Sequence, residues 1–388
     1  MSADRPEENY TNLQKLLIHF SQNGGSDLFI TAGRPATMKQ GGKLVNLTED
    51  KVLPALAKQL SSELMNHDQL STFQNTQECN FAYHIPGVAR YRVNVFMQRG
   101  TPGMVIRSVQ TEMPKFEDLN LPPVLKELIM DKNGLILIVG GTGSGKSTTL
   151  ASLVDYRNSE SEGHIITIED PIEFVHSHKR SIVTQREVGV DTDSYDNALK
   201  NTLRQAPNVI LIGEIRAKET MEHAIAFAET GHLCLSTLHA NNTNQTLDRI
   251  INFFPADEHG HILMDLSLNL KAVVSQRLVP KIGGGLIAAV EVLINTPRIG
   301  ELIFQGKVGE IKQLMQKSQG AGMQTFDQAL FNLYEDKLIS YEDALRAADS
   351  ANDLRLNIKL NSKLPVPGET DIAMSSDNSQ FNLQSNPE

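Results

Sequence analysis

Gly140-Gly-Thr-Gly-Ser-Gly-Lys-Ser147 is the stretch of sequence that decides the fold of this chain. It follows an apolar run at residues 135–139 and precedes a helical pattern formed by Leu150, Leu153 and Val154. A glycine-rich turn between a strand and a helix directs successive backbone N–H groups, and the positive end of the helix dipole, toward one anion. This context predicts a phosphate-binding loop, and it disfavours the alternative of a chance glycine-rich turn.

The residues of the loop have separate expected tasks. Lys146 is expected to reach the β- and γ-phosphates, and the Ser147 hydroxyl is expected to ligate Mg²⁺. The predicted binding set for ATP and Mg²⁺ comprises Gly140, Gly141, Thr142, Gly143, Ser144, Gly145, Lys146, Ser147 and Thr148.

The pattern around the loop is typical of an α/β protein. Short apolar runs at 165–168, 209–212 and 233–238 alternate with helical patterns, which predicts parallel strands covered by helices. The later pattern is mostly helical, and one helix is predicted to run through Leu266, Val273 and Val274 and to stop at Pro280. The predicted domains are 1–110 (a helix with alternating strands), a linker at 111–123, a core at 124–256, a mostly helical region at 257–357 and a disordered tail at 358–388.

Two carboxylates are candidates for the chemistry. Glu214 ends the run Val209-Ile-Leu-Ile-Gly-Glu214, so in a parallel sheet it should face the phosphates. Gly213 stands where many nucleotide hydrolases have an Asp, so we expect Glu214 to orient the Mg²⁺ shell or a water molecule. In Ile168-Glu-Asp-Pro-Ile-Glu-Phe174 the proline forces a turn, which would bring Glu173 over the site as a general base. Taken alone, that segment is more typical of a plain loop, and only the phosphate loop upstream favours the catalytic interpretation.

Two histidines bracket the run at 233–238. Seven residues of strand span roughly 23 Å, so His232 and His239 cannot both contact one phosphate. We expect His239 at the nucleotide end, sensing the γ-phosphate, and His232 at the far end. For His232 a structural or interface role is as well supported as a functional one.

Two arginines are expected on facing strands of a hairpin centred near residue 100. Arg92 and Arg107 are candidate cations for the charge that develops in phosphoryl transfer, with Arg99 in the turn as a third. Like charges set side by side cost energy unless an anion lies between them. The alternative is a solvated basic face.

The composition limits the partners. A net charge of −10 argues against nucleic acid as the main partner. The two cysteines, Cys79 and Cys234, are far apart, which excludes a four-thiolate zinc site. We see no apolar signal core and no apolar run near the ~20 residues that span a bilayer. We therefore expect a cytoplasmic protein whose contact with a membrane is indirect.

Together these segments resemble the secretion ATPases of the type II/type IV pilus class, and most closely the PilT/PilU retraction ATPases. The resemblance runs from about Ser26 to Leu360. Its marks are Ser26-Asp-Leu-Phe-Ile-Thr31, the phosphate loop, the Asp box at 168–174, the Walker B strand ending Gly213-Glu-Ile-Arg216 and the His box at 228–239. The stretch at 240–255 and the polar tail are similar to the PilU members. The segment Thr296-Pro-Arg-Ile-Gly-Glu-Leu-Ile303 departs from the C-terminal motif that PilT members use in retraction.

The resemblance implies a PAS-like N-terminal domain, a RecA-like core and a homohexameric ring, with ATP in the cleft between the two domains of one chain. It assigns Arg92 and Arg107 to that nucleotide. It also implies an ATPase that powers or assists type IV pilus retraction, docked at the inner-membrane base of the pilus machine. Its partners would be a PilT-type ATPase and the platform protein.

Two other roles stay open at this point. The first is a ring subunit that couples physically to a PilT-type motor and whose own hydrolysis is dispensable. The second is a RecA-type DNA translocase, which the acidic charge and the lack of a basic–aromatic stripe disfavour.

Overall fold

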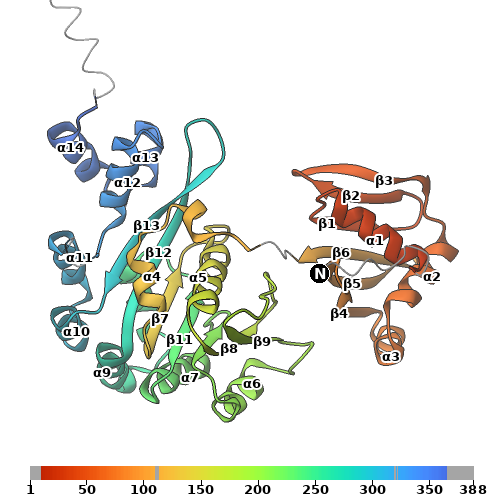
Figure 1. Ribbon diagram of the computed structural model, residues 1–388, viewed down its shortest axis with the longest axis horizontal. Coiled ribbons are helices and arrows are strands. Elements are labelled where there is room, and N and C mark those ends of the chain that lie inside the picture. Colours follow the sequence, from red (N-terminus) through yellow and green to blue (C-terminus); the bar gives the residue numbers. More distant parts are fainter. Residues whose placement is uncertain (1–9, 110–112, 319, 321, 365–388) are drawn as a thin grey trace, which may run out of the picture. The chain divides into compact units, whose positions relative to one another are not determined.

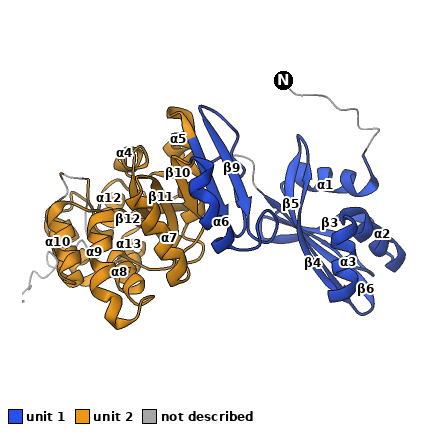
Figure 2. Cartoon of the chain, turned by 90° about the horizontal axis from the view of Figure 1, so that it is seen from below, with its two compact units in different colours: residues 1–113, 164–206 blue, residues 114–163, 207–388 orange. Residues whose placement is uncertain are grey.

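The computed structural model describes residues 10–109, 113–318, 320 and 322–364. The chain divides into two compact units (Figure 2): unit 1 is 1–113 with 164–206, and unit 2 is 114–163 with 207–388. Residues 164–206, which we expected inside the 124–256 core, group with unit 1. The domain limits given above therefore stay a prediction.

Unit 1 begins with helix α1 (Asn12–Gln22), as the spacing of Leu13, Leu17 and Phe20 predicts. The Thr11 side chain accepts a hydrogen bond from the Gln14 N–H, and the Gln14 side chain accepts one from the Thr11 N–H, so a capping box starts the helix. The three apolar side chains are fully buried. Together with α2 (Pro54–Leu64) and α3 (His67–Thr76), α1 shares one hydrophobic core with the sheet of this unit.

That sheet is antiparallel, with six strands in the order β3-β2-β1-β6-β5-β4. The strands are β1 (Asp27–Ile30), β2 (Pro35–Gln40), β3 (Lys43–Lys51), β4 (Glu78–Ile85), β5 (Ala89–Gln98) and β6 (Thr101–Val109). Along β5, Tyr91, Val93 and Val95 are buried and the residues between them are partly exposed, as a strand with one covered face requires. The predicted hairpin near residue 100 is confirmed, because β5 pairs with β6 and Arg92 lies opposite Arg107.

The rest of unit 1 comes from the middle of the chain. Strands β8 (Gly163–Glu169) and β9 (Ser181–Glu187) are neighbours, and helix α6 (Tyr195–Thr202) follows them. The Asp-Pro segment that carries Glu173 connects β8 to β9.

Unit 2 contains a mainly parallel sheet among helices (Figure 1). Five strands lie in the order β13-β12-β7-β11-β10, and only β13 runs antiparallel to its neighbour. The elements are α4 (Val124–Ile129), β7 (Gly134–Val139), α5 (Lys146–Glu160), β10 (Val209–Ile212), α7 (Lys218–Glu229), β11 (Leu233–Leu238), α8 (Thr243–Ile251), α9 (His259–Asn269), β12 (Leu270–Pro280) and β13 (Leu286–Ile294). Every residue of β7, β10 and β11 is buried, which confirms the apolar runs as strands covered on both faces.

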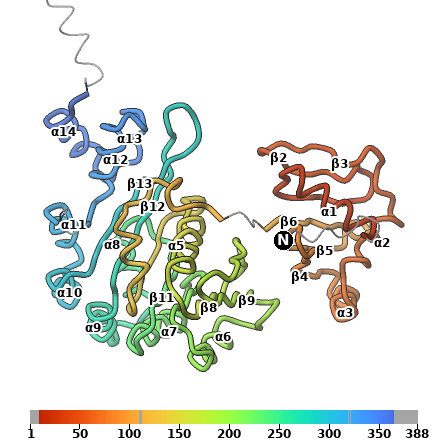
Figure 3. Tube along the Cα trace, in the orientation of Figure 1, coloured from red at the N-terminus to blue at the C-terminus, as the bar shows by residue number. Residues whose placement is uncertain are grey.

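The prediction of one helix that runs to Pro280 is wrong. Helix α9 ends at Asn269, and β12 begins at Leu270 and carries Val273 and Val274. Because β12 is buried along most of its length, its apolar residues do not alternate, and such a run cannot be told from a buried helix by periodicity. Figure 3 traces the long hairpin in which β13 returns beside β12.

The described part of unit 2 also contains the helices α10 (Pro297–Phe304), α11 (Val308–Lys317), α12 (Phe326–Glu335), α13 (Tyr341–Ala347) and α14 (Ala351–Asn361). Helix α14 continues past the predicted start of the tail, and Ile358 is buried. The rest of the tail, from residue 365, lies outside the described residues, as do 111–112 of the linker. The described part of the linker contains a short 3₁₀ helix, Phe116–Leu119. Among the described helices, none is long and apolar enough to cross a membrane.

Candidate nucleotide-binding site

The predicted phosphate loop connects β7 to α5 in unit 2, and it packs tightly against β12. A Cβ at Gly140 would lie 2.5 Å from the Gln276 carbonyl oxygen. A Cβ at Gly145 would lie 2.8 Å from the Gln276 Nε2, and Gly145 also has a φ of +87° as the N-cap of α5. Glycine is therefore required at Gly140 by the close backbone and at Gly145 by the backbone conformation.

The polar groups of the loop are arranged to receive an anion. Lys146 Nζ donates to the carbonyl oxygens of Gly140 (3.0 Å) and Gly141 (2.8 Å). Ser144 Oγ is buried and has no hydrogen-bond partner among the described residues. A lysine folded over the loop and an unsatisfied hydroxyl inside it fit a phosphate cradle. Ser147 and Thr148, at the start of α5, remain partly exposed and fit a metal–phosphate group.

Gln276 on β12 is a residue of this site that the sequence did not reveal. Its side chain is buried, and its Oε1 accepts a hydrogen bond of 2.7 Å from the Thr149 Oγ1. It thus ties the first turn of α5 to the neighbouring strand. The polar pair Ser275-Gln276 inside an apolar run was the available signal, but the incorrect helix prediction hid it.

Glu214 and His239 lie together at the carboxyl ends of β10 and β11. The two are 3.2 Å apart, between His239 Nε2 and Glu214 Oε1. Arg216, which was not among the predicted site residues, donates from Nε to the other oxygen of Glu214 at 2.7 Å. Glu214 is thus held between a cation and an imidazole, largely buried but with one edge open to solvent.

A pocket of about 500 Å³ connects His239 to the phosphate loop. Its lining includes Gly140, Gly141, His239, Asn241, Gln245, Asp248, Arg249 and Phe253. The structure therefore brings His239 next to the loop, where the strand topology predicted it. His232 lies at the other end of β11, and its carbonyl oxygen accepts from the Gly134 N–H at 3.1 Å. His232 is not among the residues that line this pocket.

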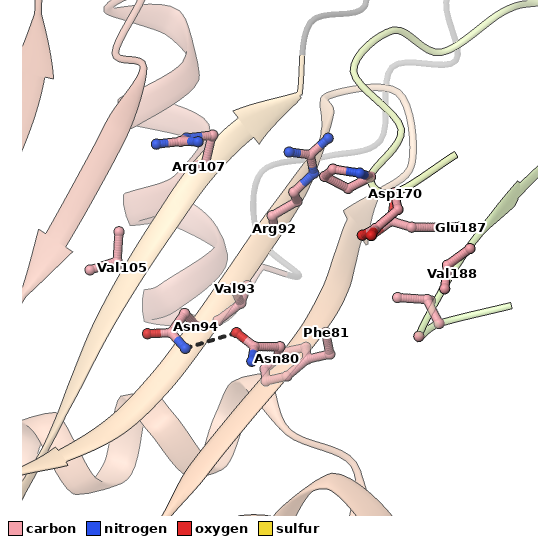
Figure 4. Close-up of a pocket in the computed structure, with 13 residues that line it drawn as sticks. Asn80, Phe81, Arg92, Val93, Asn94, Val105, Arg107, Asp170, Glu187 and Val188 are labelled. Atoms are coloured by element: carbon pink, nitrogen blue, oxygen red, sulfur yellow. Dashed lines mark hydrogen bonds between the residues drawn. The ribbon is translucent and has the colours of Figure 1, made fainter. Parts of the chain in front are cut away.

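Arg92 and Arg107 lie in unit 1, in a pocket of about 440 Å³ that also includes Asp170 and Glu187 (Figure 4). Although the two arginines face each other in register, their guanidinium groups make separate contacts. Arg92 donates to the Ile172 carbonyl, whereas Arg107 Nε donates to Asp27 Oδ1 at 2.8 Å. The charge of Arg107 still contributes to lowering the pKa of Arg92, as expected for two like charges on facing strands. Arg99 lies in the exposed turn, with a φ of +51°.

Asp27 is the charged partner of Arg107. Burial raises the pKa of Asp27, but hydrogen bonds from Arg107 and Ser26 outweigh burial and hold it below its ordinary value. The Asp27 side chain is 10% exposed and the Arg107 side chain 62% exposed, so the pair joins a buried carboxylate to a guanidinium that faces solvent.

Glu173 lies in the β8–β9 connection of unit 1, and it is exposed. Glu169, four residues earlier, is much less accessible, and burial raises the pKa of its carboxyl. Glu169 Oε1 accepts from Thr167 Oγ1 (2.7 Å) and Gln185 Nε2 (3.2 Å). Of the two glutamates, Glu173 is the more exposed, and Glu169 is engaged by two side-chain donors.

The strand–loop–helix, the tight glycines and the carboxylate at the end of the neighbouring strand define a P-loop nucleotide-binding protein. A family model described as "Type II/IV secretion system protein" matches residues 8–322, and the chain belongs to this family. Within it, the chain is 57% identical over 351 residues to the type IV pilus ATPase PilU of Pseudomonas aeruginosa, covering 90% of this chain and 92% of that protein. It is 41% identical to the retraction ATPase PilT of the same organism, over 87% of this chain and 98% of that protein.

Solved structures agree with this assignment. The crystal structure of the pilus retraction motor PilT with bound ADP is 41% identical and has a TM-score of 0.82, covering 89% of this chain and 99% of that chain. The Legionella pneumophila ATPase DotB is 26% identical, with a TM-score of 0.74 over 88% of this chain and 96% of that chain. The fold is thus the mixed α/β fold, with two sheets, of the PilT-type ATPases.

Proposed function

We propose that this chain is an ATPase that powers or assists retraction of a type IV pilus. The observation that carries the proposal is the phosphate loop of unit 2, with Glu214 and His239 at the same edge of the sheet. The 57% identity to PilU, whose name places it in the pilus machinery, supports the cellular setting.

The residues have distinct roles in this proposal. Lys146 and the loop N–H groups hold the phosphates, and Ser147 and phosphate oxygens hold Mg²⁺, which neutralises charge on the substrate. Glu214, fixed by Arg216, orients water near the phosphates. Glu173 is the general base, His239 senses the γ-phosphate, and Arg92 and Arg107 serve as cations for the developing charge. No catalytic role is proposed for His232, because its carbonyl contact is with the remote start of β7.

The proposed assembly is a cytoplasmic homohexamer at the inner-membrane base of the pilus machine. Its partners are a PilT-type ATPase and the platform protein, without nucleic acid. A PAS-like unit 1 and a RecA-like unit 2 are the corresponding fold assignments. A heterologous interface repeated around an axis closes into a ring, which would let each subunit act as one switch of a motor.

Phosphate release by purified Glu214→Ala protein tests the assignment of the site. We expect turnover at least about 100-fold below that of the unsubstituted protein, because the water or metal shell loses its orienting group. An exposed acidic residue of the same unit, Glu310, supplies the control variant Glu310→Ala. Turnover equal to that of the unsubstituted protein in the Glu214 variant would remove Glu214 from the mechanism.

A second candidate function is a ring subunit that couples to a PilT-type motor and needs nucleotide only for its shape. The observation that favours it is the higher identity to PilU (57%) than to PilT (41%). Pilus retraction in cells that carry Lys146→Ala and an active partner motor separates the two. Retained retraction favours coupling, whereas loss of retraction favours a motor driven by this chain.

A further inference from the structure

The β8–β9 connection that carries Glu173 is held by side chains of β9. Gln185 and Glu187 are two residues apart, so they lie on the same face of the strand. Gln185 Oε1 accepts from the His176 N–H at 2.7 Å, and Gln185 Nε2 donates to the Phe174 carbonyl at 2.9 Å. The same Nε2 also donates to Glu169 Oε1 at 3.2 Å. One amide thus joins the end of β8 to the backbone that follows Glu173.

The backbone that precedes Glu173 is held as well. Arg92 on β5 donates to the Ile172 carbonyl, and the Ile172 N–H donates to Glu187 Oε2 at 3.4 Å. Ile172 and Phe174, on either side of Glu173, are both buried. The Glu173 side chain itself is exposed. The result is a fixed stretch of backbone that presents one accessible carboxylate.

We infer that Gln185 is a positioning residue for ATP hydrolysis, whose amide fixes the backbone that presents Glu173. The inference rests on the proposed function, in which Glu173 is the base. The Phe174 carbonyl needs a donor and the His176 N–H needs an acceptor. A side-chain amide supplies both at every pH. A displacement of about 1 Å at a reacting group costs on the order of 100-fold in rate, so a loosened segment should act on kcat.

The experiment measures kcat and KM for ATP in three full-length variants: Gln185→Leu, Gln185→Glu and Gln59→Leu. Gln185→Leu removes the hydrogen bonds at similar volume, and we expect kcat to fall about 10- to 100-fold with KM changed by less than about threefold. Gln59 is exposed on α2 and contacts Glu63, so Gln59→Leu is the matched control and should keep kcat. A thermal melt of each variant shows that it is folded.

The pH dependence of kcat in Gln185→Glu distinguishes a positioning role of Gln185 from a merely structural one. An ionised carboxylate accepts from His176 but cannot donate to Phe174, whereas a protonated carboxyl does both. We therefore expect the kcat of this variant, relative to the unsubstituted protein, to rise as the pH falls from 8 to 6. The charged and titratable groups around this position are Glu169 on β8, which Gln185 contacts, His176, whose N–H donates to Gln185, Glu173 in the connection, and Glu187 on β9; Arg90 on β5 contacts Glu187, and Arg92 on β5 contacts the Ile172 carbonyl. The three carboxylates favour protonation of the new side chain in this range, and the arginines oppose it.

The outcomes separate the inference from the function on which it rests. An unchanged kcat in Gln185→Leu, with normal turnover by the unsubstituted protein, overturns the inference alone. The inference is also overturned if both variants at 185 melt early and lose kcat equally at every pH. If the unsubstituted protein releases no more phosphate than Lys146→Ala in the same assay, the proposed function fails instead. Should Gln185→Leu not fold, the pH profile of Gln185→Glu decides.

Discussion

At the scale of single residues, the two arginines of the β5–β6 hairpin have different partners within unit 1. Arg107 pairs with Asp27, and Arg92 donates to the Ile172 carbonyl. Burial lowers the pKa of Arg92, and the nearby charge of Arg107 adds to this effect, whereas Glu187 and Glu173 oppose it without reversing it. Arg92 is thus a partly buried cation whose direct contact is with the backbone beside the Glu173 segment.

The Asp27–Arg107 pair gives a prediction with a defined pH dependence. The pKa of Asp27 is lower in the folded protein than in the unfolded chain. Its stabilisation is thus fully present above the unfolded pKa of about 4 and is lost as the pH falls through the folded value. We expect Asp27→Asn to lower the free energy of unfolding by about 1 kcal/mol at pH 7, and the difference from the unsubstituted protein to shrink below about pH 4.

Denaturant unfolding at a series of pH values measures this difference. Asp50→Asn is the control, because Asp50 is exposed on β3. A deficit for Asp27→Asn that is the same at pH 7 and at pH 3 would contradict the stabilising role of the ion pair.

At the scale of elements, the phosphate loop depends on its contact with β12. A Cβ at Gly140 would meet the Gln276 carbonyl at 2.5 Å, whereas a Cβ at Gly141 would meet nothing within 4 Å. We expect Gly140→Ala to destabilise the protein by about 1–3 kcal/mol, because backbone has to shift to admit the methyl group. Thermal unfolding without nucleotide measures the effect, with Gly141→Ala as the control for stability. Equal melting temperatures for the two variants would show that the loop is not packed as described.

Strand β12 is also tied to the C-terminal helices. Arg277 donates to the Ala347 carbonyl at 2.7 Å and to Asp349 Oδ1 at 2.5 Å, and its guanidinium lies 3.9 Å from the centre of the Phe326 ring. A lysine has no planar fork with which to make these contacts together. Asp349 would keep its contact with Lys312 but lose the partly buried guanidinium, so we expect Arg277→Lys to cost about 1–2 kcal/mol.

Denaturant unfolding checks this expectation against Arg298→Lys. Arg298 forms an exposed pair with Glu301 on α10, for which a loss under about 0.5 kcal/mol is expected. If the two substitutions cost the same, Arg277 does not anchor β12 to the C-terminal helices.

At the scale of the whole molecule, the sequence predicted the parts that have a local signal. The buried runs of β7, β10 and β11 are too apolar and too short to be helices. The glycine pattern at 140–147 is compatible with few backbone conformations. Strand order placed His239 beside the loop and His232 away from it. The pairing of Arg92 with Arg107 followed from the hairpin alone.

The incorrect prediction and the residues that were not predicted both concern features that depend on contacts between distant parts of the chain. Strand β12 is buried on both faces, so only its pairing with β7 distinguishes it from a continuation of α9. Gln276 and Gln185 contact residues that lie elsewhere along the chain. A single glutamine belongs to no recognisable sequence motif, so neither contact could be predicted. The grouping of residues 164–206 with unit 1 had no local signal either, because that unit is discontinuous in sequence, and the predicted domain limits stay a prediction.

The proposed ring is a prediction at this scale. In sedimentation with ATP and Mg²⁺ we expect a species of six times the 42.8 kDa chain mass. A protein that stays monomeric at every concentration and in every nucleotide state would contradict the ring and the motor built on it.

The central claim is that this chain hydrolyses ATP at the loop 140–147, and phosphate release at saturating ATP and Mg²⁺ tests it most directly. The assay compares the unsubstituted protein with Lys146→Ala, and with Lys15→Ala as a control at an exposed lysine of α1. We predict that Lys146→Ala lowers kcat at least about 100-fold, because a cation is removed from the transferring phosphate, and that the control keeps its activity. Equal turnover by all three proteins would contradict the claim.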